Sequence, residues 1–239
     1  MAQPWHVIES VPTGDGVLEL RRRGERDFLI TLGGLVLMNS SAHRSELALG
    51  ALACRNLRRK ADAKVLVGGL GMAFTLRAVL DSLPTTGQVL VAELNPVMVD
   101  WCRGPLAEFT GRAVDDPRVT VEITDVGSVI RKSAMGKARF HAIVLDLYEG
   151  PGGGSGRRGA SLYGTGAAEL ARAALEPGGV YAVWGEHHDP EFEKTLREAD
   201  FAVTRERPGH GGLRHVVYLA TPKASGRPGA AKKPRRKVS

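Results

Sequence analysis

A glycine turn followed at a fixed distance by an acidic residue is the feature of this sequence best suited to chemistry. An apolar run at 64–68 leads into Gly69 and Gly71, and a second apolar run ends at Glu93. Glycines let the backbone turn tightly after a strand, and an acid about 20 residues further on accepts hydrogen bonds from a ribose. The spacing therefore predicts a nucleotide-binding βαβ unit and an adenosine-containing ligand.

What the turn lacks narrows the choice of ligand. Phe74 stands where a dinucleotide-binding turn usually has a third glycine, which disfavours NAD and FAD. The turn also lacks the Gly-Lys-Ser/Thr ending that cradles a triphosphate. S-adenosylmethionine carries ribose and adenine but no phosphate, so the pattern favours this ligand.

Further acidic residues follow the other expected strands. Asp125 comes after the apolar run at 119–123, and Asp146 ends the run that starts at 141. Glu186-His187-His188-Asp189 follows the run at 180–184. Because ligands of open parallel sheets bind outside the carboxyl ends of the strands, we expect these residues to lie around one cleft.

The elements that must position these residues alternate between strands and helices. Short alternating runs at 16–21, 27–32 and 35–38 predict a small antiparallel sheet at the N-terminus. Helical spacing follows at 45–59, 96–110, 126–133, 166–175 and 190–199, between strands at 64–68, 89–93, 119–123, 141–146 and 180–184. Two closing strands at 201–205 and 215–220 would form an antiparallel edge. The order predicts an α/β fold with a mostly parallel sheet covered on both faces.

The net charge of +7 comes from one end of the chain. Residues 223–239 hold seven basic side chains and no acid, and the rest of the chain has 26 basic and 26 acidic residues. This stretch is too poor in apolar groups to fold. We divide the chain into a β-domain at 1–44, a ligand-binding domain at 45–222 and a disordered basic tail at 223–239. The tail either keeps the protein in solution or makes weak contacts with nucleic acid.

Other features of the composition point to a cytoplasmic protein. No apolar run is long enough to cross a bilayer, and the first residues lack a signal-peptide core, so we expect no membrane partner. Cys54 and Cys102 lack metal-ligand spacing, so we expect free buried thiols and no metal ion.

Several segments together resemble the spermidine/spermine synthase family. They are 65–77, Ala92-Glu-Leu-Asn-Pro96, Asp115-Asp-Pro-Arg-Val119 with Asp125, Ile143-Val-Leu-Asp146, Leu162-Tyr163 and Glu176-Pro-Gly-Gly179. The resemblance implies a small N-terminal β-domain before a Rossmann-like, methyltransferase-type domain with a mostly parallel seven-stranded sheet. It also implies a homodimer that associates through the N-terminal region.

The resemblance also implies roles for particular residues. Glu93 with Leu94 would bind the ribose hydroxyls, and Asp125 with Val126 would hold the adenine edge. Gly69, Gly71 and Met72 would form the turn beside the donor. Asp146 would occupy the acidic position at the reaction centre, in contact with the donor.

The chain departs from the family pattern at three places. Met72 replaces an acid of the first turn that contacts the amino ligand. Arg44-Ser45-Glu46 occupies the position of a Tyr-His-Glu element of the family. Asp146-Leu-Tyr-Glu-Gly-Pro151 occupies the position of an Asp-Ser-Ser-Asp-Pro loop. Without the acid at Met72, S-adenosylmethionine with its carboxylate should bind at least as well as its decarboxylated form.

We therefore expect methyl transfer from S-adenosylmethionine to an unidentified small-molecule acceptor, with S-adenosylhomocysteine as product. One alternative is aminopropyl transfer from decarboxylated S-adenosylmethionine to a polyamine, which releases methylthioadenosine. Another is a non-catalytic protein that binds an adenosine ligand or nucleic acid.

Candidate catalytic and acceptor-binding residues follow from the chemistry of displacement at a sulfonium carbon. Asp146 or His187 could take a proton from the acceptor, beside Tyr148. Glu149, Tyr163 and Trp184 could bind the acceptor, because a desolvated cation needs carboxylates and aromatic faces. Each has a structural alternative: Asp146 could cap a turn, His187 could lie on the surface, and the aromatic residues could be core.

Overall fold

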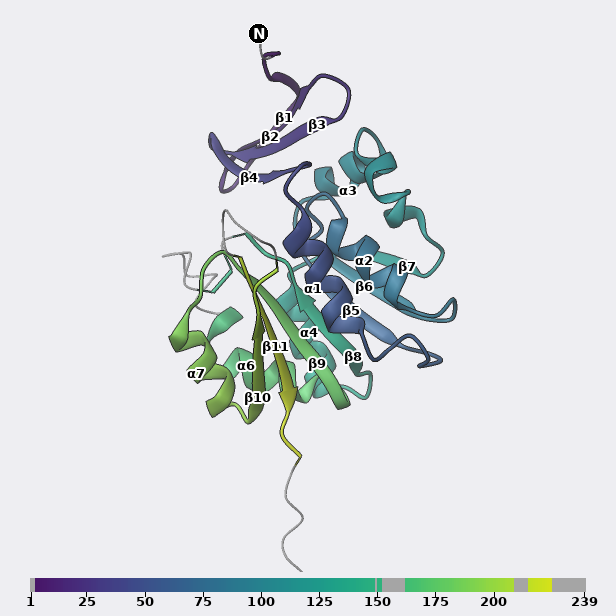
Figure 1. The fold of residues 1–239 in the computed structure, drawn as a ribbon, viewed down its shortest axis with the longest axis vertical. Coiled ribbons are helices and arrows are strands. Elements are labelled where there is room, and N and C mark those ends of the chain that lie inside the picture. Colours follow the sequence, from purple (N-terminus) through teal and green to yellow (C-terminus); the bar gives the residue numbers. More distant parts are fainter. Residues whose placement is uncertain (1–2, 149, 152–161, 209–214, 225–239) are drawn as a thin grey trace, which may run out of the picture.

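Two sheets organise the protein (Figure 1), whose computed structural model describes residues 3–148, 150–151, 162–208 and 215–224. The small sheet is an antiparallel meander of β1 (His6–Thr13), β2 (Gly16–Arg23), β3 (Asp27–Leu32) and β4 (Leu35–Asn39). The large sheet has seven strands. The expectation of a small N-terminal β-sheet before a Rossmann-like α/β sheet is confirmed.

The small sheet is apolar on the face that meets the rest of the protein. Leu18, Leu20, Phe28 and Ile30 alternate along β2 and β3 and are all buried. Because successive side chains of a strand point to opposite faces, this period of two gives the sheet one buried side. That side fixes the small sheet above the large one.

The large sheet consists of β5 (Lys64–Gly68), β6 (Gln88–Glu93), β7 (Val119–Ile123), β8 (Phe140–Leu145), β9 (Leu175–Gly185), β10 (Phe201–Glu206) and β11 (Val216–Pro222). Its order is β10-β11-β9-β8-β5-β6-β7. Neighbouring strands from β9 to β7 are parallel, whereas β11 pairs antiparallel with both β9 and β10. The predicted antiparallel edge is therefore confirmed. The order reverses beside β5, which opens a crevice at the carboxyl ends of the strands.

Helices cover both faces of the large sheet. One apolar core contains side chains from α1 (Arg44–Cys54), α2 (Phe74–Ser82) and α3 (Pro96–Arg103), together with the small sheet. The other contains side chains from α4 (Val126–Met135), α6 (Thr165–Ala173) and α7 (Pro190–Glu198). Cys54 and Cys102 are free and buried in the first core.

Three element boundaries differ from the sequence expectation by five residues or more, and β1 was not among the expected strands. α1 ends at Cys54 rather than 59, and a turn follows in which the Leu57 N–H donates to the Cys54 carbonyl. α3 ends at Arg103 rather than 110, where the Gly104 N–H donates to the Asp100 carbonyl. Two 3₁₀ helices, η1 (Ala107–Thr110) and η2 (Ala113–Asp115), then lead toward β7. β9 starts five residues early, and Gly178 inside it has φ +76°. Glycine adopts this left-handed conformation without strain, so it accommodates an irregularity within the strand.

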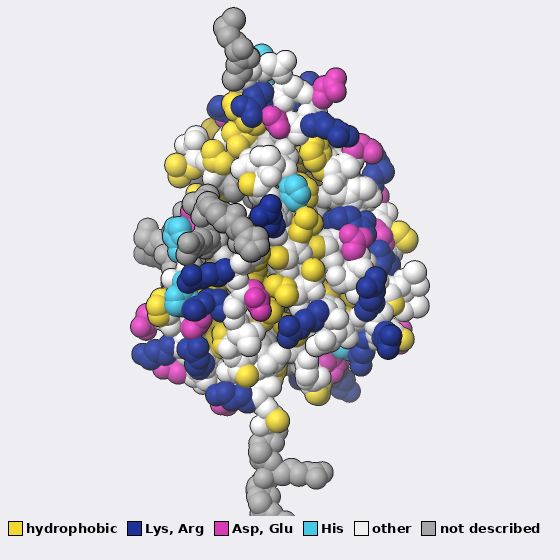
Figure 2. All heavy atoms as spheres, in the orientation of Figure 1, with side chains coloured by type: hydrophobic (Ala, Val, Ile, Leu, Met, Phe, Trp, Pro, Cys, Tyr) yellow, Lys and Arg dark blue, Asp and Glu magenta, His cyan; other side chains and the backbone are white. Residues whose placement is uncertain are grey.

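Part of the sequence expectation falls outside the described residues. These parts are residues 225–239 of the basic tail and Glu149. On the face that Figure 2 shows, basic and acidic side chains are interspersed over the main body. No helix in the described part of the chain is long and apolar enough to cross a membrane. The domain limits at 44 and 222 stay predictions.

Candidate functional site

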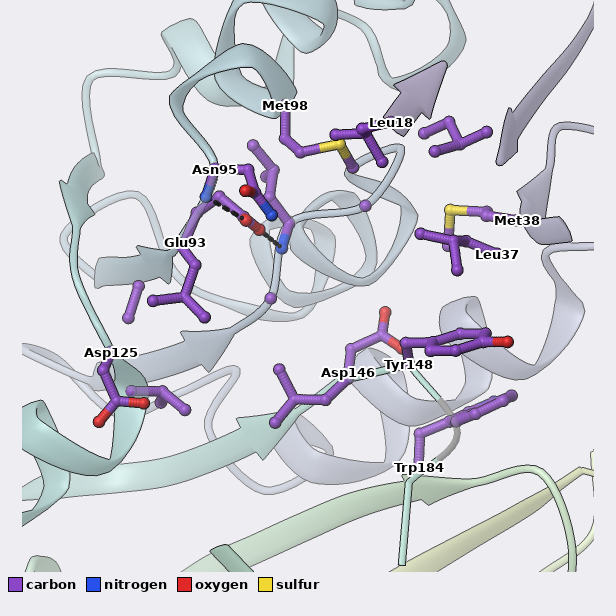
Figure 3. Close-up of a pocket in the computed structure, with 18 of the residues that line it drawn as sticks. Leu18, Leu37, Met38, Glu93, Asn95, Met98, Asp125, Asp146, Tyr148 and Trp184 are labelled. Atoms are coloured by element: carbon purple, nitrogen blue, oxygen red, sulfur yellow. Dashed lines mark hydrogen bonds between the residues drawn. The ribbon is translucent and has the colours of Figure 1, made fainter. Parts of the chain in front are cut away.

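A cavity of about 270 Å³ lies between the small sheet and the carboxyl ends of the parallel strands (Figure 3). Its floor comes from the carboxyl ends of β6 and β9 and from the segments that follow β5, β6, β7 and β8, and its roof comes from the small sheet. The lining residues that argue for a function are Glu46, Gly69, Gly71, Glu93, Leu94, Asp125, Val126, Asp146, Tyr148 and Trp184. The strand-end rule thus brings together residues that are far apart in the sequence.

Glu93 is fixed by the turn that it faces. Its Oε2 accepts a hydrogen bond of 2.8 Å from the Leu70 N–H, and its Oε1 accepts one of 2.9 Å from the Asn95 N–H. The residue is buried, yet it lines the cavity beside Leu94. A carboxylate has about four acceptor positions, so two remain for a diol.

The glycine turn packs directly against Asp146. Gly69 has φ +85°, and a Cβ there would lie 2.3 Å from the Asp146 carbonyl oxygen. The Gly69 N–H donates to the Ala92 carbonyl, and the Asp146 N–H donates to the Gly68 carbonyl. Only glycine fits this close approach.

Met72 lies elsewhere than the sequence analysis expected. Its side chain is buried in the apolar core and does not line the cavity, and its N–H lies 3.1 Å from the Met38 sulfur. Ala73, with φ +64°, follows it as the N-cap residue of α2. The missing acid at this position therefore does not decide the charge of the site.

Asp125 has a structural role as well as a place in the cavity. Its side chain caps α4, since Oδ1 accepts from the Ser128 N–H at 2.8 Å and from the Ser128 hydroxyl at 3.1 Å. Asp125 and Val126 both line the cavity. The cap fixes the carboxylate at the rim and leaves its other oxygen free of these bonds.

Asp146 is the acid of the site whose pKa is shifted furthest from its ordinary value. Burial raises its pKa to about 7, and the negative charge of Glu46 acts in the same direction, while the hydrogen bond from Thr75 opposes them. The Thr75 hydroxyl donates to Asp146 Oδ2 at 2.6 Å. A carboxyl group with this pKa is ready to exchange a proton near neutral pH.

Glu46 was missed as a site residue by the sequence analysis. It comes from the first turn of α1, is 6% exposed, and accepts a 2.5 Å hydrogen bond from the Ser45 hydroxyl. The sequence did contain a sign of this role. Glu46 is the one residue of Arg44-Ser45-Glu46 that is identical to its counterpart in the Tyr-His-Glu element of the family. It lines the cavity with Asp146.

Aromatic residues lie at the opposite end of the cavity from Asp125. Figure 3 shows Tyr148 and Trp184 at one end, Glu93 and Asp125 at the other, and Asp146 between them. The indole Nε1 of Trp184 is buried without a hydrogen-bond partner in the described part of the chain. This end can therefore receive a molecule with both apolar and polar groups.

Tyr163 does not line the cavity. Its ring packs edge-on against Phe192, with 5.5 Å between centroids, and its buried hydroxyl has no partner among the described residues. Burial raises the pKa of Tyr163, and the charge of Asp146 adds to the effect. The hydroxyl therefore stays neutral and lies near Asp146.

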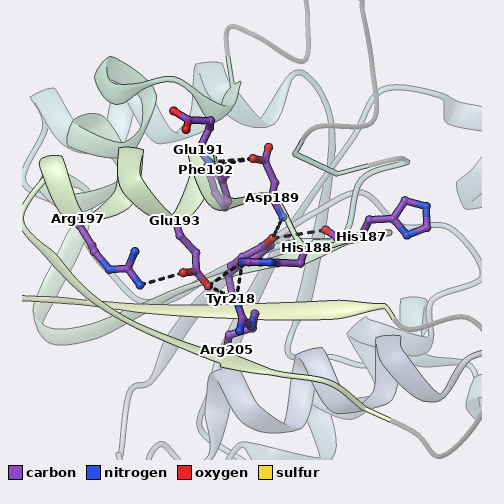
Figure 4. A network of polar contacts seen from close by, with 9 residues as sticks. All are labelled: His187, His188, Asp189, Glu191, Phe192, Glu193, Arg197, Arg205 and Tyr218. Atoms are coloured by element: carbon purple, nitrogen blue, oxygen red, sulfur yellow. Dashed lines mark hydrogen bonds and ion pairs between the residues drawn. The ribbon is translucent and has the colours of Figure 1, made fainter.

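The residues after β9 form a surface network away from the cavity (Figure 4). The His187 side chain is 74% exposed, so it is not placed to take a proton in the cavity. His188 contacts Glu193 and Arg205, and Asp189 caps α7. Burial opposes ionisation of Glu193, but the hydrogen bond from Arg197 and the charges of Arg205, Arg197 and His188 lower its pKa overall.

The small sheet supplies an apolar wall that sequence patterns did not reveal. Leu18, Ile30, Leu37 and Met38 line the cavity from above, and Met98 joins them from α3. These residues have ordinary strand and helix spacing, so nothing in the sequence separates them from core positions. No group of His, Cys, Asp and Glu suited to a metal ion occurs among the described residues.

Comparisons with known proteins place these residues in a family. The spermine/spermidine synthase domain matches residues 53–199. A polyamine aminopropyltransferase of Mycobacterium tuberculosis strain H37Rv is 32% identical over 77% of this chain and 34% of its own length. Another from Aeropyrum pernix is 30% identical over 62% of this chain and 46% of its own length. The chain spans about a third to a half of the length of these relatives.

Solved structures show the same fold. A spermidine synthase in complex with the transition state analogue AdoDATO superposes with a TM-score of 0.68 at 18% identity, over 90% of this chain and 72% of that one. The spermidine synthase of Thermotoga maritima gives a TM-score of 0.66 at 20% identity, with the same coverage of both chains.

These findings correct the expected reaction. The prediction of a methyltransferase that uses S-adenosylmethionine is wrong, because the relatives are named polyamine aminopropyltransferases. The prediction rested on Met72, whose side chain lies in the core. Acids from other elements line the cavity instead.

The family match covers more than half of the chain and includes the glycine turn, Glu93, Asp125 and Asp146. The relatives and the shared fold agree with it. The chain therefore belongs to the spermine/spermidine synthase family.

Proposed function

We propose that this protein transfers an aminopropyl group from decarboxylated S-adenosylmethionine to an amine and releases methylthioadenosine. The observation that carries the proposal is the charge of the cavity. Glu46, Glu93, Asp125 and Asp146 line it, and none of its described lining residues is Lys, Arg or His. The carboxylate of the full donor would meet like charge there, whereas decarboxylated donor and amine are both cations.

The donor is assigned to the end of the cavity that holds Glu93 and Asp125. The two unused acceptor positions of Glu93 suit the ribose hydroxyls, and the rim position of Asp125 with Val126 suits the adenine edge. The Gly69 turn permits close approach of the ligand. This orientation directs the sulfonium toward Asp146.

The acceptor amine is assigned to the end that holds Tyr148 and Trp184. Its ammonium must lose a proton before the nitrogen attacks the carbon bound to sulfur. The new C–N bond forms as the C–S bond breaks, and methylthioadenosine leaves with the bonding electrons. Asp146 takes the proton, because its pKa of about 7 lies near that of an efficient general base.

The outer face of the small sheet supports a homodimer. The strand register puts Val7, Val17 and Val36 on the face opposite the buried leucines, and all three are exposed by 44% or more. Exposed apolar side chains on a sheet of this size favour a partner, and we assign that partner to a second copy of this chain.

The experiment offers the protein decarboxylated S-adenosylmethionine with putrescine, spermidine or a primary monoamine, and detects aminopropylated amines by mass spectrometry. Wild-type protein should form one of these products, and Asp146→Asn should lower the turnover rate by about 100-fold. Asp100→Asn, at an exposed position of α3, is the matched control and should keep wild-type turnover. Binding of methylthioadenosine without turnover of any amine would contradict the proposal.

A further inference from the structure

A line of hydrogen bonds leads from the cavity to His215. The Ser45 hydroxyl donates to Glu46 Oε2 at 2.5 Å, and the same hydroxyl lies 2.8 Å from His215 Nδ1. Glu46 lines the cavity, Ser45 belongs to the start of α1, and His215 precedes β11. Two residues adjacent in sequence thus meet a histidine 170 positions further along the chain.

The single proton of the serine hydroxyl fixes the direction of these bonds. A carboxylate only accepts, so the Ser45 proton points to Glu46. His215 Nδ1 must then carry a proton and donate it to the Ser45 oxygen. The other ring nitrogen, Nε2, is left to exchange protons.

This line runs from two buried residues to a partly exposed one. Glu46 is 6% exposed and Ser45 is 4% exposed, whereas His215 is partly exposed. The His215 ring contacts the edge of Trp184, with 4.9 Å between ring centroids, and Trp184 lines the cavity. The line therefore joins the acidic part of the cavity to a side chain in contact with solvent.

We propose that Glu46, Ser45 and His215 form a relay that carries the acceptor's proton out of the cavity, a role that rests on the proposed aminopropyl transfer. Asp146 and Glu46 share the cavity, so a proton removed from the amine can pass to Glu46. Ser45 and His215 touch neither substrate and act through Glu46 as positioning residues.

Each proton in this step has a donor and an acceptor. Once Glu46 is protonated, it no longer needs the Ser45 proton, and His215 exchanges protons with water, from the tautomer protonated at Nδ1 to the one protonated at Nε2. The proton on Glu46 then moves to the Ser45 oxygen while the Ser45 hydroxyl proton moves to the free Nδ1 of His215. The imidazolium then loses its Nε2 proton to water. Glu46 is again a carboxylate, and His215 is left protonated at Nδ1, as the hydrogen bonds of the structure require.

Ionisable groups on the neighbouring elements define the surroundings of the relay. Arg44 and Glu46 belong to α1, Asp146 follows β8, and Glu186 and His187 follow β9. Of these, Glu46 is the group that the described hydrogen bonds connect to His215. The test must therefore separate His215 and Ser45 from the general charge of the region.

The first measurement is single-turnover transfer with decarboxylated S-adenosylmethionine and the amine that wild-type protein accepts. Ser45→Ala and His215→Gln should each slow the transfer by about 10- to 100-fold, with donor affinity within about twofold of wild type. Ser45→Thr keeps the hydroxyl and should recover most of the rate. His6→Gln, at an exposed position of β1, is the matched control and should behave like wild type.

Two further readouts respond to proton transfer and not to structure alone. The transfer rate is measured in mixtures of light and heavy water and plotted against the deuterium fraction. The plot should be curved for wild-type protein, because several protons move in the relay, and it should be a straight line for Ser45→Ala. Added imidazole should accelerate His215→Ala. Wild-type transfer rates in Ser45→Ala and His215→Gln would overturn the relay. A straight-line plot of rate against deuterium fraction for wild-type protein would also overturn it.

A measurement without turnover separates this inference from the proposed function. Nitrogen chemical shifts of labelled histidine should show His215 protonated at Nδ1 in wild-type protein and at Nε2 in Ser45→Ala. The same tautomer in both proteins would overturn the relay even if the enzyme is active. If the tautomer of His215 changes as expected but the protein turns over no amine, the hydrogen bonds from Glu46 to His215 are supported and aminopropyl transfer is contradicted.

Discussion

Asp146 lies partly buried in the cavity with a raised pKa, and this makes the stability of the protein without ligand depend on pH. Its pKa of about 7 in the folded state lies above the ordinary value of 3.8, so the folded state binds more protons. Stability is highest where the carboxyl is protonated in both states, and it falls as pH rises from about 4 to 7. Above pH 7 the penalty amounts to about 4 kcal/mol.

Asp146→Asn should remove this penalty. We expect the variant to be more stable than wild-type protein at pH 8 and to differ little from it at pH 4, in urea unfolding followed by circular dichroism. Asp100→Asn should keep the wild-type pH dependence. If wild-type protein and Asp146→Asn lose stability in parallel between these pH values, the carboxyl is not held in its neutral form.

Glu93→Gln should weaken the binding of methylthioadenosine by about 1.5–3 kcal/mol, because a hydrogen bond to a charged acceptor is lost and an amide group now faces a backbone N–H. The amide replaces a carboxylate of nearly the same size, so the core should remain intact. Titration calorimetry measures the change, and Glu122→Gln, exposed on β7, is the control. Equal affinity in all three proteins would remove Glu93 from the donor site.

The sequence predicted those site residues that follow parallel strands. Gly69, Glu93, Asp125 and Asp146 all line the cavity, because strand order and the carboxyl-end rule suffice to bring them together. Glu46 comes from a helix that precedes the first parallel strand, so no such rule applies to it. The side chain of Met72 could not be placed, because its direction depends on the left-handed backbone at Gly71 and Ala73.

At the scale of elements, the contact between the β5 turn and the end of β8 determines the shape of the site. Gly69→Ala should destabilise the protein by more than about 2 kcal/mol and abolish ligand binding, because its Cβ would overlap the Asp146 carbonyl at a positive φ. Gly166→Ala lies in α6 with no atom within 4 Å of the new Cβ, so it should be neutral or stabilising. Thermal unfolding of both variants, with ligand binding, tests this difference. The opposite ranking, with Gly166→Ala the less stable variant, would contradict the close contact between Gly69 and Asp146.

The order of strands and helices was predictable because each apolar run has a clear period. The end of α3 and the start of β9 were not predictable. The first depends on a hydrogen bond at Gly104, and the second depends on the pairing of Leu175 with Phe140. Such bonds form only in the folded chain.

At the scale of the molecule, the small sheet both covers the cavity and offers an apolar outer face. Val17→Lys combined with Val36→Lys should convert a dimer to a monomer, because two desolvated cations would face the partner copy. Sedimentation at micromolar concentration measures the change. Met135→Lys, exposed on α4, should remain dimeric. A monomeric wild-type protein, or a dimer in every variant, would exclude this interface.

We expect the acidic cavity to select the donor without a carboxylate. The most direct measurement supplies equal concentrations of S-adenosylmethionine and its decarboxylated form with the accepted amine, and quantifies the aminopropylated amine and both nucleoside products by mass spectrometry. Four carboxylates and no cation among the described lining residues predict that methylthioadenosine, formed together with aminopropylated amine, dominates by at least about fivefold, since a like-charge contact costs about 1 kcal/mol or more. Formation of S-adenosylhomocysteine as the main product would contradict this selection.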